Sequence, residues 1–354
     1  MKVSSNNSLE KTSDLHVVET RPLIPPRQLH QDLPLDYTSA NTVSNTRELI
    51  KNILHKNEAR FLVIVGPCSI HDVEAAKEYS GYIKDLRRKY SDKLEIVMRV
   101  YFEKPRTTVG WKGMINDPHL DGSYDINTGL RRARGLLRLL ASEGIPAATE
   151  LLDPIVPQYI ADLISWTAIG ARTTESQTHR EMASGLSMPI GFKNGTDGSV
   201  TTAINAMQSA ARSHHFLGVN SDGFASIVNT TGNPDTHIVL RGGAQGPNFD
   251  NFHITKISSD LTNNQLPQKV MIDCSHGNSN KDFRKQSNVL ENISKQLKDG
   301  EKNILGVMLE SHLKEGNQKL SLKTDLEYGK SITDACINIE TTQDLLANLY
   351  KCIN

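Results

Sequence analysis

The stretch FLVIVG at residues 61–66 is the first of eight short apolar runs that recur along the chain as far as residue 309. Runs of this kind, separated by segments with helical periodicity, are typical of parallel strands covered on both faces. The runs are FLVIVG (61–66), EIVM (95–98), PAATE (146–150), AIGA (168–171), PIGF (189–192), HIVL (237–240), KVMID (269–273) and ILGVML (304–309). Eight such strands predict an α/β fold, a closed (β/α)8 TIM barrel.

Nearly every run ends at a residue that can bind a phosphate, a carboxylate or a metal. In strand order these residues are Cys68, Arg99, Glu150, Arg172, Lys193, Arg241, Asp273 with His276 behind it, and Glu310. Barrels of this type carry their active sites at the C-terminal ends of the strands. The pattern therefore predicts an enzyme and names most of its active site.

Composition narrows the possible partners and location. The 354 residues include 40 basic and 40 acidic side chains, so no global field favours nucleic acid or a membrane surface. The N-terminus lacks the apolar core of a secretory signal, and no segment approaches the roughly 18 apolar residues of a transmembrane helix. Four cysteines in a chain of this length do not form a disulfide framework, which makes the cytoplasm the expected location.

The chain divides into a tail, an arm and a barrel. We expect residues 1–15 to be a disordered tail, and 16–57 to be an N-terminal arm and helix, with 16–36 extended because of their proline pattern. The arm could lie on its own barrel or reach a neighbouring subunit. The barrel is expected over 58–354.

Two stretches interrupt the barrel. The polar loop 101–127 has a length that is usually functional, and residues 215–231 predict an inserted β-hairpin that turns at Asp222-Gly223. Between the strands, apolar periodicity predicts helices near 41–57, 72–89, 128–143, 155–165, 176–185, 198–212, 281–299 and 340–351. Asp72 is the expected N-cap of the second of these helices.

Four residues could form a metal site: Cys68, His276, Glu310 and Asp334. A thiolate, an imidazole and two carboxylates suit a divalent first-row metal better than magnesium or calcium. Such an ion would polarise a carbonyl group as a Lewis acid. The alternative is that the cysteine is a small buried hydrophobe and the histidine is structural.

A cluster of cations follows the same strand ends, comprising Arg99, Lys104, Arg106, Arg172, Lys193 and Arg241. Gathered at one barrel mouth, these side chains would repel each other unless anions lay among them. Their number exceeds what one monophosphate needs, which indicates two phosphorylated or carboxylated substrates. Together with a Lewis-acid metal, the cluster predicts an aldol-like joining of a carbonyl compound to a phosphorylated carbon nucleophile.

At these positions the chain resembles the class I, feedback-regulated 3-deoxy-D-arabino-heptulosonate 7-phosphate (DAHP) synthases over residues 35–354. The motifs that carry the resemblance are GPCSIHD (66–72), MRVYFEKPRTTVGWKG (98–113), GARTTESQTHRE (170–181), GFKNGTDG (191–198), LRGG (240–243), DCSHGNSNKD (273–282), ESHLKEGNQ (310–318) and YGKSITDAC (328–336). The resemblance implies condensation of phosphoenolpyruvate with erythrose 4-phosphate, the first step of the shikimate pathway. It also implies one divalent metal ion (Mn, Fe, Co or Zn) on the four ligands named above.

The resemblance assigns further residues to the substrates. It implies phosphoenolpyruvate contacts at Arg99, Glu150, Ala171, Arg172, Lys193 and Arg241. It implies erythrose 4-phosphate contacts at Lys104, Pro105, Arg106 and Thr107. Lys104 is the expected proton donor, and His179 is expected to help position the attacking water.

In this family the inserted hairpin and the arm build an effector site and subunit contacts, which implies a homodimer or homotetramer. The implied inhibitor pocket is lined by Asp153, Pro157, Gln158, Ser187, Phe216 and Gly218. Gly218 is smaller than the serine that phenylalanine-sensitive members can carry there, and the extra room favours tyrosine over phenylalanine. Two other functions stay open, a sister condensation on arabinose 5-phosphate and a catalytically silent sensor of aromatic amino acids.

Overall fold

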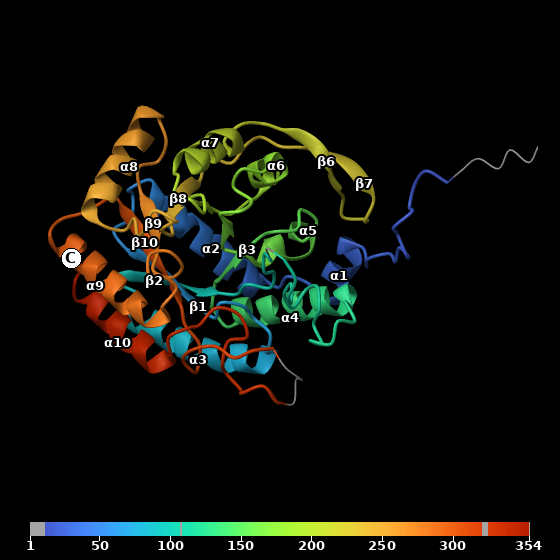
Figure 1. Cartoon of the computed structure of the whole chain (residues 1–354), viewed down its shortest axis with the longest axis horizontal. Helices are drawn as coiled ribbons and strands as arrows, with labels where there is room; N and C mark the ends of the chain where they lie inside the picture. Colours follow the sequence, from blue (N-terminus) through green and yellow to red (C-terminus); the bar gives the residue numbers. More distant parts are fainter. Residues whose placement is uncertain (1–10, 107, 321–324, 354) are drawn as a thin grey trace, which may run out of the picture.

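The computed structural model describes residues 11–106, 108–320 and 325–353. Eight parallel strands close into a barrel in the order β1-β10-β9-β8-β5-β4-β3-β2, which confirms the predicted fold class (Figure 1). The barrel strands are β1 (Phe61–Gly66), β2 (Leu94–Arg99), β3 (Ala147–Glu150), β4 (Trp166–Ile169), β5 (Ile190–Lys193), β8 (Thr236–Leu240), β9 (Val270–Asp273) and β10 (Ile304–Glu310). Every residue of these strands is buried, as expected for strands covered on both faces.

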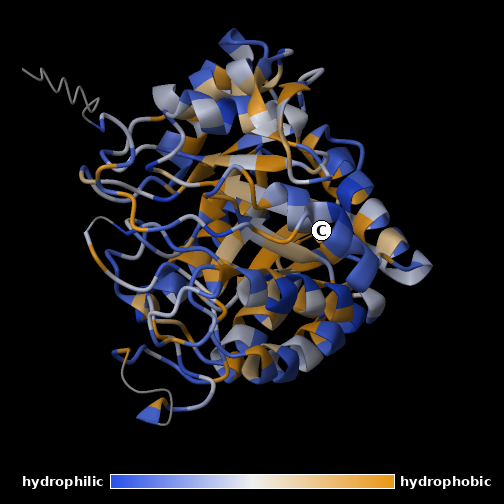
Figure 2. Ribbon diagram, turned by 90° about the vertical axis from the view of Figure 1, so that its right-hand side faces the viewer, coloured by the Kyte–Doolittle hydropathy of each residue, from blue (hydrophilic) through white to orange (hydrophobic). Residues whose placement is uncertain are grey.

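Alternate strand residues face two separate hydrophobic layers. In β1, Leu62 and Ile64 belong to the cluster inside the barrel, whereas Val63 and Val65 belong to the cluster that the surrounding helices cover. The alternation follows from the pleat of a strand, which points successive side chains to opposite faces. Figure 2 shows hydrophobic residues concentrated in the central strands, and helices that combine hydrophobic and hydrophilic faces.

The helices pack against the barrel, and α2, α3, α4, α6, α8 and α10 each begin after a capping side chain. Asp72 accepts hydrogen bonds from the backbone N–H groups of Glu74 and Ala75 (2.9 and 3.2 Å) and caps α3, as predicted. The helices are α2 (Tyr37–Leu54), α3 (Val73–Lys89), α4 (Ile126–Ser142), α5 (Pro157–Ile160), α6 (Gln177–Gly185), α7 (Thr201–Ala210), α8 (Asn251–Asn263), α9 (Gln286–Lys298) and α10 (Ile339–Tyr350). Within the described ranges, none of them has the length and apolar character needed to cross a membrane.

Two helical segments differ from the predictions. Helix α8 was not predicted, because only Ile254, Ile257 and Leu261 mark its buried face among many polar residues. The helix expected over 155–165 is shorter and divides into α5 and a 3₁₀ turn, Ala161–Leu163.

The N-terminal arm contains a helix where an extended chain was expected. Helix α1 spans Pro26–Asp32, begins with a proline at its first position and buries Leu29 completely. The buried guanidinium of Arg134 donates to the Leu33 carbonyl oxygen at 2.8 Å and ties the end of α1 to α4. Before α1 the chain extends away from the barrel (Figure 1), and Val18 is fully exposed.

The predicted hairpin consists of β6 (His215–Val219) and β7 (Ala225–Asn229), which pair antiparallel outside the barrel (Figure 1). Its turn includes Gly223, at φ +85°, whose N–H donates to the carbonyl oxygen of Asn220 at 3.0 Å. The guanidinium of Arg27 in α1 pairs with the carboxylate of Asp222 at the tip. The arm and the hairpin therefore contact each other within one chain.

Candidate active site

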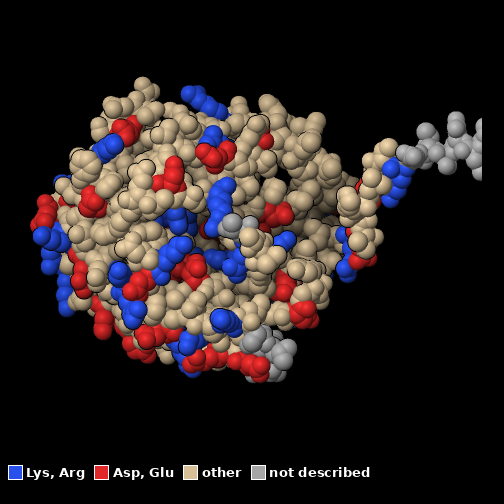
Figure 3. Space-filling view, viewed as in Figure 1, with Lys and Arg blue, Asp and Glu red and all other residues tan. Residues whose placement is uncertain are grey.

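A cavity of about 720 Å³ lies at the C-terminal ends of the barrel strands. Figure 3 shows a hollow near the middle of this face, with lysine, arginine and acidic side chains gathered in and around it. The predicted site residues that line it are Arg99, Lys104, Pro105, Arg106, Glu150, Ala171, Arg172, Lys193, Arg241, His276, Glu310 and Asp334. Thr107 lies outside the described residues.

The barrel brings these residues together because parallel strands end at one rim. Arg99, Glu150 and Lys193 are the last residues of β2, β3 and β5, and Glu310 ends β10. Residues that are far apart in the chain therefore share a single mouth.

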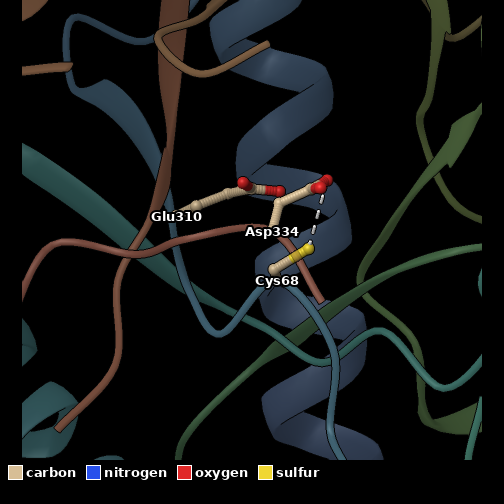
Figure 4. A group of neighbouring side chains, drawn as sticks. All are labelled: Cys68, Glu310 and Asp334. Carbon is tan, nitrogen blue, oxygen red and sulfur yellow. Dashed lines mark hydrogen bonds between the residues drawn. The ribbon is translucent and has the colours of Figure 1, made fainter. Parts of the chain in front are cut away.

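Three of the four predicted metal ligands form a tight group. The thiol sulfur of Cys68 and a carboxylate oxygen from each of Glu310 and Asp334 all lie within 4.8 Å of one another. Figure 4 shows the three side chains turned toward each other, with the Cys68 thiol 3.6 Å from Asp334 Oδ2. The thiol and the Glu310 carboxylate are buried and Asp334 is exposed. One thiol and two carboxylates fit a divalent cation, which would balance their charge.

The burial of Cys68 determines the protonation state of its thiol. Burial raises the pKa of the Cys68 thiol to about 11, and the neighbouring Glu310 carboxylate adds to the shift. The thiol is therefore protonated in the absence of a cation. A bound divalent ion would favour the thiolate, because a metal ligand must lose its proton.

His276 lies in the same cavity but is not part of the group of three. Its Nδ1 is 2.9 Å from Asp273 Oδ2 and 2.8 Å from the hydroxyl oxygen of Ser275. Ring nitrogen Nε2 is the one that remains for a cation.

Arg99 is held in a fixed position beneath the cavity. Its guanidinium pairs with Glu310 at 2.9 Å, donates to the Pro67 carbonyl oxygen at 3.0 Å and lies 3.6 Å from the ring centre of Tyr101. Burial alone would lower the pKa of Arg99, but Tyr101 and Glu310 outweigh burial and raise it. The group is a permanent buried cation.

Lys193 lies between two buried carboxylates. Its ammonium nitrogen is 3.5 Å from Glu150 Oε2 and 3.6 Å from Asp273 Oδ2. Burial by itself would raise the pKa of each carboxyl group. Lys193 outweighs burial at Glu150 and lowers the pKa of that carboxyl below its ordinary range. At Asp273, His276 and Lys193 together outweigh burial and lower the pKa well below its ordinary range. The site therefore holds ionised acids as well as cations.

Lys104 joins the metal group to the loop after β2. Its ammonium nitrogen lies 3.2 Å from the Cys68 sulfur and 3.3 Å from the Cys68 carbonyl oxygen. Two residues further along, Arg106 donates to the Trp111 carbonyl oxygen at 2.8 Å, which folds the loop back on itself.

The comparisons with known proteins agree with this geometry. The model of the DAHP synthetase I family matches residues 37–347. The chain belongs to this family. The predicted family and enzyme class are thus confirmed.

Several relatives align over almost the whole chain. The Phe-sensitive phospho-2-dehydro-3-deoxyheptonate aldolase of Escherichia coli K12 is 55% identical over 97% of this chain and 98% of its own length. The Tyr-sensitive enzyme of the same organism is 51% identical over 97% and 96%. The tyrosine-inhibited enzyme of Schizosaccharomyces pombe is 48% identical over 97% and 94%.

A solved structure has the same fold. Phospho-2-dehydro-3-deoxyheptonate aldolase from Francisella tularensis SCHU S4 superposes with a TM-score of 0.93 at 52% identity. It covers 95% of this chain, and the chain covers 98% of it. DAHP synthases of this class are in general metal-dependent, which agrees with the donor group around Cys68.

His179, the residue predicted to position the attacking water, forms hydrogen bonds with protein groups. His179 Nε2 is 2.7 Å from the Leu152 carbonyl oxygen, and Nδ1 is 2.9 Å from the Ser176 hydroxyl. Both ring nitrogens are thus engaged, and His179 is not among the residues that line the cavity. The geometry lends no support to a role in positioning water.

The predicted inhibitor residues fall into two groups. Phe216 and Gly218 share the half-buried face of β6, and Val228, which pairs with Phe216, lines a second cavity of about 490 Å³ with Ser187. Asp153, Pro157 and Gln158 lie at the start of α5, where Asp153 accepts a hydrogen bond from the Ile155 N–H.

Sequence reasoning missed the connection between this region and the active site. The buried carboxyl of Glu103, next to Lys104, accepts the backbone N–H groups of Leu152 (3.3 Å) and Asp153 (3.2 Å). Burial raises the pKa of Glu103 to about 8. A charged residue directly before the KPR motif was the available signal, but its burial depends on the tertiary fold.

Proposed function

We propose that this chain condenses phosphoenolpyruvate with erythrose 4-phosphate and water to give DAHP and inorganic phosphate. The observation that carries the proposal is a cavity at the strand ends whose lining combines several cations with Glu310 and Asp334, the two carboxylates that lie beside the Cys68 thiol. Family membership supports the same reaction.

One divalent first-row metal ion (Mn, Fe, Co or Zn) would be held by Cys68, Glu310, Asp334 and His276. When bound, this ion would act as a Lewis acid on the aldehyde oxygen of the sugar phosphate. The donor set supports the assignment, since a thiolate disfavours magnesium and calcium.

Phosphoenolpyruvate would be bound by the cations at or just beyond the ends of β2, β4, β5 and β8. The proposed contacts are Arg99, Arg172, Lys193 and Arg241, with Glu150 and the backbone of Ala171. The immobile guanidinium of Arg99 supports this role, because a preformed cation loses little conformational entropy when an anion binds.

Erythrose 4-phosphate would be bound by Lys104, Pro105, Arg106 and Thr107. Lys104 would then lie between the two substrates. The short distance from its ammonium group to the Cys68 sulfur supports that position, because it places a proton donor next to the proposed metal site.

The reaction joins C3 of phosphoenolpyruvate to the aldehyde carbon, and Lys104 delivers a proton to the developing alkoxide. The oxygen of water forms a bond to C2, giving a hemiketal phosphate. The C2 hydroxyl then loses its proton to solvent and forms the ketone as the C–O bond to the phosphate group breaks, and inorganic phosphate leaves with the electron pair of that bond. The cations of the cavity keep both anionic substrates oriented through these steps.

An aromatic amino acid would inhibit the enzyme, with tyrosine favoured over phenylalanine. Gly218 lies on the half-buried hairpin face, and a Cβ atom there would come within 2.6 Å of Val228 Cγ2, so a serine at this position would crowd the Val228 side chain. The pocket would comprise Asp153, Pro157, Gln158, Ser187, Phe216 and Gly218.

A phosphate-release assay tests the proposed function. Release is expected with both substrates together, and it should stop on chelation and return with added Mn²⁺. Turnover of arabinose 5-phosphate in place of erythrose 4-phosphate would indicate the sister reaction. Tight binding of an aromatic amino acid without turnover would indicate a silent sensor.

The same assay, repeated with each aromatic amino acid, identifies the effector. Tyrosine should inhibit at lower concentration than phenylalanine. A response to tryptophan alone would contradict the proposed role of Gly218.

A further inference from the structure

Asp273, the last residue of β9, contacts two groups of the site and has no role in the reaction described above. It is completely buried. Its Oδ2 atom lies 2.9 Å from His276 Nδ1 and 3.6 Å from Lys193 Nζ. Its Oδ1 atom accepts hydrogen bonds from the backbone N–H and the hydroxyl of Ser275, at 3.0 and 2.6 Å. One carboxylate thus contacts both a proposed metal ligand and a proposed substrate cation.

The contact with His276 decides which ring nitrogen can bind a metal. An ionised carboxylate only accepts hydrogen bonds, so Nδ1 must carry the hydrogen that it shares with Asp273. The Ser275 hydroxyl donates its own hydrogen to Asp273 and therefore presents only lone pairs to Nδ1. In the neutral imidazole, the form that binds a metal, Nε2 then bears the free lone pair.

The contact between Asp273 and Lys193 affects how strongly the site attracts an anionic substrate. The Lys193 ammonium has Glu150 on one side and Asp273 on the other, at nearly equal distances. Each negative charge reduces the positive potential that an incoming phosphate or carboxylate would meet at Lys193. Asp273 therefore weakens the attraction of Lys193 for an anion while it keeps the ammonium group in place.

We propose that Asp273 is a positioning residue that fixes the tautomer of His276 for the metal and restrains the affinity of Lys193 for phosphoenolpyruvate. The inference rests on the proposed function. Loss of its charge should change the two affinities in opposite directions, whereas a general disturbance of the fold would lower both.

The test compares metal-free wild-type protein with Asp273→Asn, using the full chain. Mn²⁺ and phosphoenolpyruvate are titrated separately by calorimetry. The amide should raise the dissociation constant for Mn²⁺ by about 10- to 100-fold, the usual effect of removing a carboxylate partner of a metal-bound histidine. The dissociation constant for phosphoenolpyruvate, measured without metal, should fall, by up to roughly tenfold.

Glu95→Gln is the matched control. Glu95 is another buried strand carboxylate, paired with Arg87 and absent from the cavity lining, so the same chemical change should leave both constants within about twofold. Circular dichroism confirms that each variant is folded. Ser275→Ala keeps the Asp273 charge and should weaken Mn²⁺ binding less than Asp273→Asn does.

Three outcomes would overturn the proposal. The first is a dissociation constant for Mn²⁺ in Asp273→Asn within about threefold of the wild-type value. The second is weaker binding of both Mn²⁺ and phosphoenolpyruvate by Asp273→Asn. The third is a larger loss of Mn²⁺ affinity in Ser275→Ala than in Asp273→Asn. Wild-type protein that binds neither ligand and releases no phosphate would instead contradict the proposed function.

Discussion

At the level of single residues, several side chains of the candidate site are buried before any ligand binds. Cys68 is completely buried, two residues beyond the end of β1, and its thiol faces two carboxylates and the Lys104 ammonium. Such a group can serve as a metal ligand only if the cation compensates for the loss of its proton.

Cys68→Ala should remove one of the proposed metal ligands and leave the fold intact. We expect Mn²⁺ affinity and phosphate release to fall by at least about 100-fold, since removal of a direct ligand should exceed the 10- to 100-fold effect of an outer partner. Calorimetry and the phosphate-release assay measure the two effects. Cys352→Ala, near the C-terminus, is the control and should behave as wild type. Full activity of Cys68→Ala in added Mn²⁺ would show that the ligand assignment is wrong.

Glu103 should make stability depend on pH. Its pKa is raised from 4.5 to about 8 by burial, so the folded protein binds this proton more tightly than the unfolded chain. The stabilisation is fully present below pH 4.5 and is lost as the pH rises through about 8.

Glu103→Gln, which stays neutral, should therefore gain stability relative to wild type as the pH rises. The gain is at most about 1.4 kcal/mol for each pH unit between the two pKa values. Urea unfolding at pH 5.5, 7 and 8.5 measures it. Glu315→Gln, at an exposed position, is the control. A stability difference that does not change with pH would contradict the buried, protonated state.

At the level of elements, the barrel closes where β1 pairs with β10, and this contact needs a glycine. The register places Leu62 opposite Gly306, and a Cβ atom on Gly306 would lie 2.1 Å from the Leu62 carbonyl oxygen. Backbone atoms cannot move aside in a closed barrel without disturbing the neighbouring pairs.

Gly306→Ala should therefore destabilise the protein, by about 1–3 kcal/mol as is usual for overpacking. Gly135→Ala in α4 is the matched control, because a Cβ atom there meets no atom within 4 Å. In a helix interior that change should stabilise by about 1 kcal/mol. Denaturant unfolding compares the two, and equal effects would contradict the role given to the β1–β10 contact.

At the level of the whole molecule, the hairpin and the arm present apolar side chains to solvent. Leu217 and Ile227 pair across the hairpin and are 88% and 73% exposed. An exposed apolar patch on a β-ribbon is typical of a surface that contacts a second subunit. This supports the homodimer or homotetramer that the family resemblance implies.

The double substitution Leu217→Asp and Ile227→Asp should shift the protein to a smaller assembly, because burying two carboxylates at an interface is unfavourable. Light scattering after size-exclusion chromatography measures the mass. Phe252→Asp, which changes an exposed apolar residue on α8, should leave the mass unchanged. A double variant with the mass of the wild type would show that this face lies outside the subunit contacts.

The amino-acid sequence by itself determined the barrel and the chemistry of its rim. Eight apolar runs predicted eight strands, because burial on both faces of a parallel sheet demands nearly continuous hydrophobicity. Local signals in the sequence also predicted the Asp72 helix cap and the Asp222-Gly223 turn. Helices α1 and α8 were missed because their few apolar residues become informative only when a neighbouring surface is known.

Only the tertiary structure decided which rim residues act on one another. It brought Cys68 close to Glu310 and Asp334, and it tied His276 to Asp273. It also placed both ring nitrogens of His179 within hydrogen-bond distance of other groups, the Ser176 hydroxyl and the Leu152 carbonyl oxygen. Hydropathy and spacing report whether a side chain is buried and which strand carries it. The distances and burial that set hydrogen-bond partners and pKa values depend on strands far apart in the chain, and these meet only when the barrel closes.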